Sequence, residues 1–169
     1  MINEQELMQS IDNFLSENKE AMLADLKTLI GQPSVRGEAA PGAPYGTDVN
    51  AALEKALAIA RRMGLETENC AGNIGWADLP GKSKKQIATI THLDVVPAGN
   101  GWTSDPFEMI VKDGCVIGRG TLDDKGPAVL TLYIAKFFKE RGEQLPYTLR
   151  LLFGTDEETG MEDVEWYLE

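Results

Sequence analysis

Three clusters along the chain contain carboxylates, and the first of them also contains the only histidine. Their members are His92 with Asp94, Asp123 with Asp124, and Glu157 with Glu158. Imidazole nitrogen and carboxylate oxygen are the ligands that bind zinc and similar divalent cations in proteins. A bound zinc ion lowers the pKa of water to about 7, and a nearby carboxylate can then accept its proton. The clusters therefore point to metal-dependent hydrolysis.

The spacing of His92 and Asp94 favours a metal-binding role for this histidine. A lone histidine is more often structural than a ligand. A ligating histidine, however, usually donates its other ring N–H to a carboxylate, a carbonyl or water. Residues two positions apart in an extended segment point to the same side. We therefore expect Asp94 to support His92, either directly or through the groups around it.

The pair Asp123 and Asp124 has two interpretations. Aspartate favours the start of a helix, so capping of the helix that follows explains one of the two residues. A carboxylate also has two oxygens, so one aspartate can bridge two cations about 3.5–4 Å apart. Capping explains less well why two adjacent carboxylates follow Gly118-Arg-Gly120.

Glu157 and Glu158 follow an apolar run and a glycine. A solvated acidic turn is the commonest fate of adjacent glutamates. Adjacent residues in an extended turn point in different directions, however, so one glutamate can ligate a metal while the other faces the attacking water. That division of roles suits hydrolysis.

Other common catalytic chemistries fit the sequence poorly. It contains no Gly-x-Ser-x-Gly motif, and neither Cys70 nor Cys115 has a histidine beside it. The glycines of residues 118–126 do not have the spacing of a phosphate-binding loop, and Lys125 is not followed by Ser or Thr.

The pattern of apolar residues predicts the elements that must position these clusters. In the first half of the chain we expect one broken helix or two short ones at residues 4–31, a loop at 33–47, and a helix at 48–63 capped by Thr47 or Asp48. Strands should follow at 66–70 and 73–79, and a buried strand at 86–91. In the second half we expect a hairpin around Asp113-Gly114, a helix at 126–140, a strand at 147–153 and a helix at 161–169. Helices and strands alternate, which predicts an α/β fold with a mostly parallel sheet and flanking helices. His92 and Glu157 then follow strand ends, where open α/β sheets bind ligands.

Composition limits the class of partner. The chain has 169 residues and a formal net charge of −11, which argues against nucleic acid and against anionic membranes. Met1–Glu6 does not resemble a secretory signal, and no apolar run reaches the roughly 18 residues of a membrane span. Two cysteines without CxxC spacing favour free thiols. We expect one domain and a cytoplasmic location.

Three ordered motifs resemble those of the M20 metallopeptidases. They are His92-Leu-Asp94-Val-Val-Pro97, Gly118-Arg-Gly-Thr-Leu-Asp123-Asp124-Lys-Gly-Pro127 and Gly154-Thr-Asp-Glu157-Glu158-Thr-Gly160. Their form is similar to that of the dipeptidase V group, the Xaa-His or carnosinase-like dipeptidases. The resemblance implies that residues 1–169 form the N-terminal part of a catalytic domain. Residues 1–32 would be its helical start, 33–47 a loop, and 48–169 the α/β region that holds the metal site.

The resemblance also implies a role for each site residue. His92 would ligate one zinc ion and Glu158 the other, while Asp123 bridges both and is followed by a cis peptide bond. Glu157 would be the general base, and Asp94 would tune His92. Manganese or cobalt would also suit these ligands.

Hydrolysis of dipeptides with release of the N-terminal residue is the function that the resemblance implies. N-acyl-amino-acid deacylation and succinyl-diaminopimelate desuccinylation are alternatives within the family, and a truncated non-catalytic domain is an alternative of another class. We expect a further acidic ligand, a further histidine and the lid domain to lie beyond residue 169. Each metal then keeps two protein ligands from this chain, which predicts weak metal binding and little activity for the isolated 169 residues. The oligomeric state stays open.

Overall fold

A computed structural model describes residues 3–142 and 144–169. Residues 1, 2 and 143, the first two of which belong to the predicted helical start, lie outside the described residues. The helices are α1 (Glu4–Ile30), α2 (Thr47–Arg62), α3 (Lys125–Glu140) and α4 (Glu162–Leu168), and the strands are β1 (Glu66–Cys70), β2 (Ile74–Leu79), β3 (Gln86–His92), β4 (Ile110–Lys112), β5 (Cys115–Ile117) and β6 (Thr148–Gly154). The α/β class is as expected.

The main sheet is mixed, so the expectation of a mostly parallel sheet is wrong. Its strand order is β1-β2-β6-β3. β3 and β6 are parallel, whereas β1 pairs with β2 and β2 pairs with β6 in antiparallel fashion. The three residues between β1 and β2 are too few for a parallel crossover, so these strands form a hairpin. Only β3 and β6 are separated by a helical crossover, which runs through α3.

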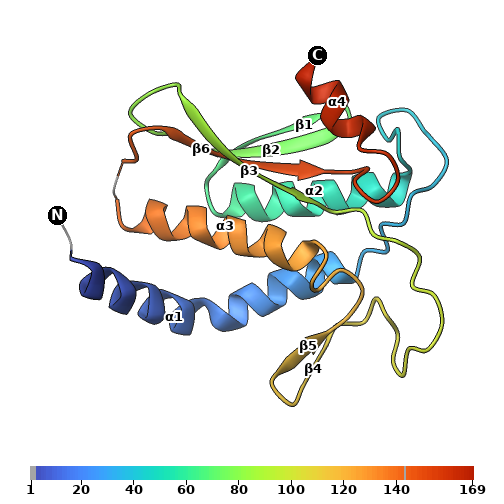
Figure 1. Cartoon of the computed structure of the whole chain (residues 1–169), viewed down its shortest axis with the longest axis horizontal. Helices are drawn as coiled ribbons and strands as arrows, with labels where there is room; N and C mark the ends of the chain where they lie inside the picture. The colour runs from blue at the N-terminus through green and yellow to red at the C-terminus, as the bar shows by residue number, and fades with distance from the viewer. Residues whose placement is uncertain (1–2, 143) are drawn as a thin grey trace.

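The main sheet has helices stacked on one face (Figure 1). α2 and α3 lie against the sheet, and α1 packs on the far side of them. Alternate residues of β6, including Leu151 and Phe153, point into this core, where they meet Leu53 and Leu57 of α2 and Leu132 of α3. Burial of these side chains stabilises the layers by roughly 1.5–3 kcal/mol each.

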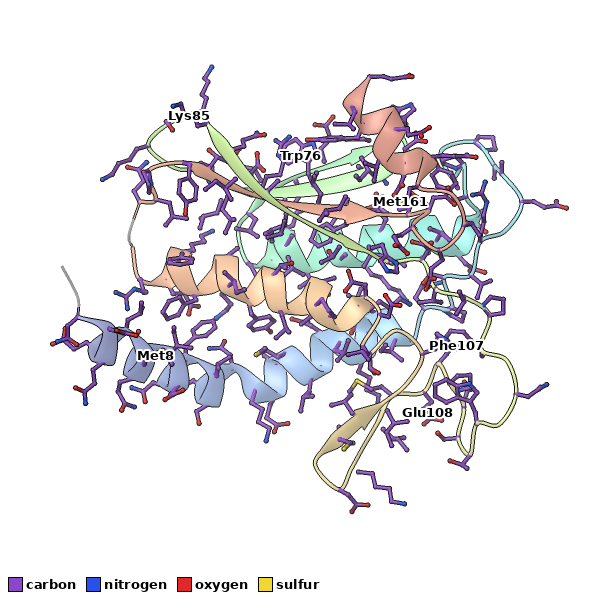
Figure 2. All side chains as sticks on the ribbon, viewed as in Figure 1. Met8, Trp76, Lys85, Phe107, Glu108 and Met161 are labelled. Carbon is purple, nitrogen blue, oxygen red and sulfur yellow. The ribbon has the colours of Figure 1, made fainter. Side chains whose placement is uncertain are left out.

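The opposite face of the sheet is covered only in part. Trp76 lies on this face, to the left of α4 in the view of Figure 2. The guanidinium of Arg150 lies 4.3 Å from the centroid of the Trp76 ring. It also donates to both carboxylate oxygens of Asp78, at 2.8 and 2.7 Å, and to the Tyr167 hydroxyl of α4 at 2.8 Å. These polar contacts attach α4 to the sheet.

β3 lies at an edge of the sheet, which contradicts the prediction of a buried strand. Ile87 and Ile90 are 50% and 53% exposed. A run of β-branched residues fits either a central strand or an edge strand, because the pattern does not reveal how many neighbours a strand has. The carboxyl end of the strand is buried, however, at Thr91 and His92.

Helix α1 is continuous from Glu4 to Ile30, so the expected break is absent. The polar residues between Leu15 and Met22 interrupt the apolar spacing, but they are compatible with a helix. Asn3 and Glu6 form a capping box in which each side chain accepts the other residue's backbone N–H. The polar stretch therefore marks a solvent-facing part of one long helix.

Neither Thr47 nor Asp48 caps α2, because both lie inside its first turn. The N-cap is Gly46, with φ of 110° and no side-chain cap. A Cβ atom at this position would lie 2.8 Å from the backbone nitrogen of Gly37. Close approach of the two backbones therefore requires glycine here.

No described helix is long and apolar enough to cross a bilayer.

Candidate metal centre

Parallel pairing of β3 and β6 brings two of the three clusters together. His92 is the residue of β3 opposite Gly154 of β6, and the backbone N–H of Leu93 donates to the Gly154 carbonyl at 2.9 Å. The segments that leave the two strands therefore start side by side. This is the arrangement expected from strand ends alone.

The third cluster joins them through the turn that precedes α3. Nε2 of His92 lies 3.0 Å from Oδ1 of Asp123. Each of His92, Asp123 and Glu158 offers one ligand atom, and these atoms all lie within 4.8 Å of one another. Oε2 of Glu157 is 3.7 Å from Nε2 of His92. The structure thus gathers all four residues into one cluster.

Asp94 is buried beside His92, on the side away from Asp123. Its Oδ1 lies 3.3 Å from Nδ1 of His92, and its backbone carbonyl lies 3.1 Å from the same nitrogen. The carboxylate also accepts the backbone N–H of Glu157 at 3.2 Å and that of Glu158 at 3.0 Å. The contact with His92 matches the expectation, whereas the contacts with the glutamate turn were not foreseen.

The peptide bond between Asp123 and Asp124 is cis. Asp124 is the N-cap residue of α3, but its side chain does not cap the helix. Its Oδ2 instead accepts the backbone N–H of His92 at 3.2 Å. The capping interpretation is therefore wrong for this side chain, which links the turn before α3 to the end of β3.

Lys125 is a structural support that the sequence reading missed. It is fully buried, and its Nζ donates to the carbonyls of Leu29 at 3.0 Å and Gln32 at 2.7 Å. These bonds tie the start of α3 to the end of α1. The sequence signal was a lysine next to two aspartates, and its acceptors lie more than 90 positions away, at and just after the end of α1.

The protonation of the cluster reflects its excess of carboxylates. Burial alone would lower the pKa of His92, but Asp94, Asp123 and Asp124 outweigh it and raise the pKa to about 9. Burial raises the pKa of Glu158, and the negative charge of Asp123 raises it further. Burial likewise raises the pKa of Asp124. Carboxylates that are held close together and destabilised in their charged form fit a site for a cation.

The donor set agrees with this interpretation. One imidazole nitrogen and several carboxylate oxygens suit zinc, and also manganese or cobalt. An open cleft of about 310 Å³ adjoins the cluster, and His92, Asp123 and Glu157 contribute to its lining together with Ile90 and Met161. Met161 lies in the turn after β6 (Figure 2). A small ligand could therefore reach His92 and Asp123.

Fold and site together define an α/β protein with a candidate divalent-cation centre at the carboxyl ends of two parallel strands. Residues 88–169 match the family model described as peptidase family M20/M25/M40. The chain belongs to peptidase family M20. Its fold, a mixed sheet with flanking helices, matches part of the catalytic domain of that family.

Individual relatives agree with this assignment. The chain is 39% identical over 153 residues to the Beta-Ala-Xaa dipeptidase of Lactobacillus delbrueckii subsp. lactis, covering 89% of this chain and 32% of the relative. Human carnosine dipeptidase 1 superposes with a TM-score of 0.79 at 21% identity, covering 95% of this chain and 37% of that one. The chain thus spans about a third of the length of the curated relatives that it matches.

A more distant solved structure shares the fold. It is the Bacillus subtilis YXEP protein, described as a dinuclear metal binding peptidase from the M20 family. The TM-score is 0.63 at 16% identity, and the match covers 92% of this chain and 40% of that chain.

Proposed function

We propose that the chain forms the metal-binding part of a dipeptidase that hydrolyses small peptides and releases their N-terminal residue. The observation that carries this proposal is the convergence of ligand atoms from His92, Asp123 and Glu158 within 4.8 Å. Three segments far apart in sequence contribute to that convergence, which surface acidity alone does not explain. The Beta-Ala-Xaa specificity in the name of the Lactobacillus relative supports a dipeptide substrate.

Each site residue has a role in the proposal. His92 would hold one zinc ion, Glu158 would hold a second, and Asp123 would serve both. Asp123 suits this bridging role, because its side chain is 72% exposed and the residue lines the cleft. Asp94 fixes the orientation of His92 by accepting from Nδ1, which leaves Nε2 free to ligate.

Hydrolysis then requires a base beside the ligands. Bound zinc would lower the pKa of water to about 7 and would polarise the peptide carbonyl. Glu157 accepts the proton of the attacking water at its carboxylate and delivers it to the leaving amine. Its Oε2 lies 3.7 Å from Nε2 of His92, close enough to face the same water. Asp94 holds the backbone of Glu157 in place.

Residues 1–169 correspond to the N-terminal part of an M20 catalytic domain, and the family resemblance implies that a further acidic residue and a further histidine complete the two metal sites. The isolated chain should therefore bind metal weakly and hydrolyse peptides slowly or not at all. A cytoplasmic location stays a prediction.

Titration of the 169-residue chain with Zn²⁺ tests the ligand assignment. His92→Ala, Asp123→Ala and Glu158→Ala should each weaken binding, while Glu165→Ala, an exposed carboxylate of α4, should not. Unchanged affinity in the first three variants would show that the ligands are wrong.

Hydrolysis assays on a longer polypeptide that contains this chain test the substrate class. Dipeptides with a free amino terminus should be cleaved, and Glu157→Gln should abolish cleavage while Zn²⁺ still binds. Turnover of N-acyl amino acids without turnover of dipeptides would instead favour a deacylase or desuccinylase. Metal binding without turnover of either class would favour a non-catalytic domain.

A further inference from the structure

The turn after β6, residues 155–161, carries Glu157 and Glu158, and a buried aspartate within the turn stabilises its conformation. Asp156 is fully buried. Its side chain accepts the Thr159 hydroxyl at 2.6 Å and the backbone N–H of Glu162 at 3.3 Å. The conformation of the glutamate turn therefore depends on the carboxylate of Asp156.

The backbone of Asp156 contributes to the same turn. Its carbonyl accepts the backbone N–H groups of Gly160 at 3.1 Å and Met161 at 2.8 Å. Asp163, also buried, accepts the N–H groups of Thr155 at 2.6 Å and Asp156 at 3.2 Å. Residues on both sides of the two glutamates are thus fixed to one another.

Arg36 supplies the positive charge that this arrangement needs. Its Nη1 forms an ion pair with Oδ1 of Asp156 and lies 3.2 Å from the Thr159 hydroxyl. Among the residues that the structure describes, it is the one basic side chain in an ion pair with Asp156. A buried carboxylate without a partner is strongly destabilising, so this contact holds the turn in its present form.

The loop that carries Arg36 is itself attached to the segment that follows β3. The Ser34 hydroxyl donates to the carbonyl of Leu93 at 2.5 Å, and the Ser34 carbonyl accepts from the N–H of Val95 at 3.0 Å. Leu93 and Val95 flank Asp94. Two residues further along the loop, Arg36 reaches the glutamate turn, so one short segment touches both strand-end clusters.

Contacts with Tyr45 help to fix the Arg36 side chain that pairs with Asp156. Its guanidinium lies 5.0 Å from the centroid of the Tyr45 ring. The backbone N–H of Gly37 donates to the carbonyl of Tyr45 at 3.0 Å. Stacking of this kind limits the conformational freedom of arginine and favours a fixed contact.

We propose that Arg36 is a positioning residue of the metal centre, which fixes the turn bearing Glu157 and Glu158 against the segment bearing His92 and Asp94. This inference rests on the proposed function. Arg36 touches none of the predicted metal ligands in the contacts described, so it acts through Asp156 and Thr159.

The test compares Arg36→Met and Arg36→Lys with the unaltered 169-residue chain. Arg61→Met is the matched control, because Arg61 pairs with an exposed glutamate of α2 at 3.0 Å, far from the site in the fold. Zn²⁺ affinity is measured by titration, the absorption spectrum of the Co²⁺ form reports ligand geometry, and amide hydrogen exchange reports the turn. Urea unfolding identifies the variants that are folded.

Arg36→Met should lose exchange protection at Gly160 and Met161 and should bind Zn²⁺ about 10–100-fold more weakly, the range typical for loss of a group that supports metal ligands. Its Co²⁺ spectrum should differ from that of the unaltered chain, which a general loss of stability in a folded protein would not produce. Arg36→Lys retains the charge and should recover part of the affinity. Arg61→Met should match the unaltered chain.

Unchanged exchange and unchanged Zn²⁺ affinity in folded Arg36→Met would overturn the inference. If Arg36→Met does not fold, Arg36→Lys decides, because it keeps the ion pair but loses the planar fork, and an affinity equal to that of the unaltered chain would then overturn it. Failure of the unaltered chain to bind Zn²⁺ would contradict the proposed function instead. In that case exchange at Gly160 and Met161 would still decide whether Arg36 fixes the turn.

Discussion

Oδ2 of Asp94 accepts a hydrogen bond from the backbone N–H of Glu158, with 3.0 Å between the two atoms. The same carboxylate lies 3.3 Å from Nδ1 of His92 through Oδ1. One buried side chain therefore sets both the orientation of the histidine and the position of the glutamate turn. Because these groups come from two strands that are parallel neighbours, Asp94 joins the two strand ends at the point where the candidate ligands converge.

Asp94→Asn is expected to weaken Zn²⁺ binding by about 10–100-fold. Asparagine has one acceptor oxygen where aspartate has two, so its amide group would face an N–H of the glutamate turn or Nδ1 of His92. Titration of the 169-residue chain measures the effect, and Asp12→Asn on the exposed face of α1 is the control. Equal affinity in Asp94→Asn and in the unaltered chain would show that Asp94 supports neither ligand.

In the metal-free chain, His92 is expected to titrate with a pKa of about 9. Its carboxylate neighbours stabilise the imidazolium more than burial penalises it. NMR of the ring protons measures this directly in an untagged chain, since His92 is the only histidine. Asp94→Asn should lower the pKa towards its ordinary value. A pKa at or below 6.5 in the unaltered chain would contradict the expectation.

The raised pKa of His92 also determines in which direction the stability of the folded chain changes with pH. The folded state binds the proton more tightly than the unfolded state, so the contribution of His92 is complete below the unfolded value of about 6.5. It is lost as the pH rises through about 9. Urea unfolding of the metal-free chain between pH 6 and 10, compared with His92→Gln, should show this loss only in the unaltered chain. Parallel curves for the two proteins would contradict it.

Local sequence patterns predicted most of the elements well, and the fold brings the candidate site residues His92, Asp123 and Glu158 close together. Apolar periodicity located most helices and strands, because burial on one face requires that spacing, although it wrongly predicted a break in α1. The position of His92 and Glu157 just after strands followed from the same pattern. Their convergence required only the parallel pairing of β3 and β6, which a helical crossover between the strands imposes.

Relationships between distant segments were not accessible in the same way. The short turn between β1 and β2 already implies a hairpin. The antiparallel pairing of β2 with β6, however, joins segments far apart in sequence, and no local pattern encodes it. The exposure of Ile87 and Ile90 depends on whether β3 has a second neighbour, and no local pattern encodes that. Lys125 and Arg36 find their partners more than 90 positions away, so their roles emerge only from the fold.

Lys125→Met is expected to destabilise the chain by about 1–3 kcal/mol. The carbonyls of Leu29 and Gln32 would lose their donor in a buried place, while methionine fills much of the same volume. The loss is limited because burial already disfavours the charged amine and lowers the pKa of Lys125 to about 7. Urea unfolding measures the change, with the exposed Lys19→Met as control. Stability equal to that of the control variant would show that the two hydrogen bonds make no net contribution to the free energy of unfolding.

The packing of α3 between the sheet and α1 leads to a prediction that does not involve the metal centre. Leu132 is fully buried, whereas Leu130 on the same helix is 51% exposed. Leu132→Ala is expected to reduce the free energy of unfolding by about 2–5 kcal/mol, because it removes apolar contacts and leaves a cavity among side chains from the sheet and α2. Leu130→Ala, with the same change in helix propensity, should cost less than about 1 kcal/mol. Urea unfolding of the two variants compares them directly, and similar losses in both would show that α3 does not pack against the sheet as described.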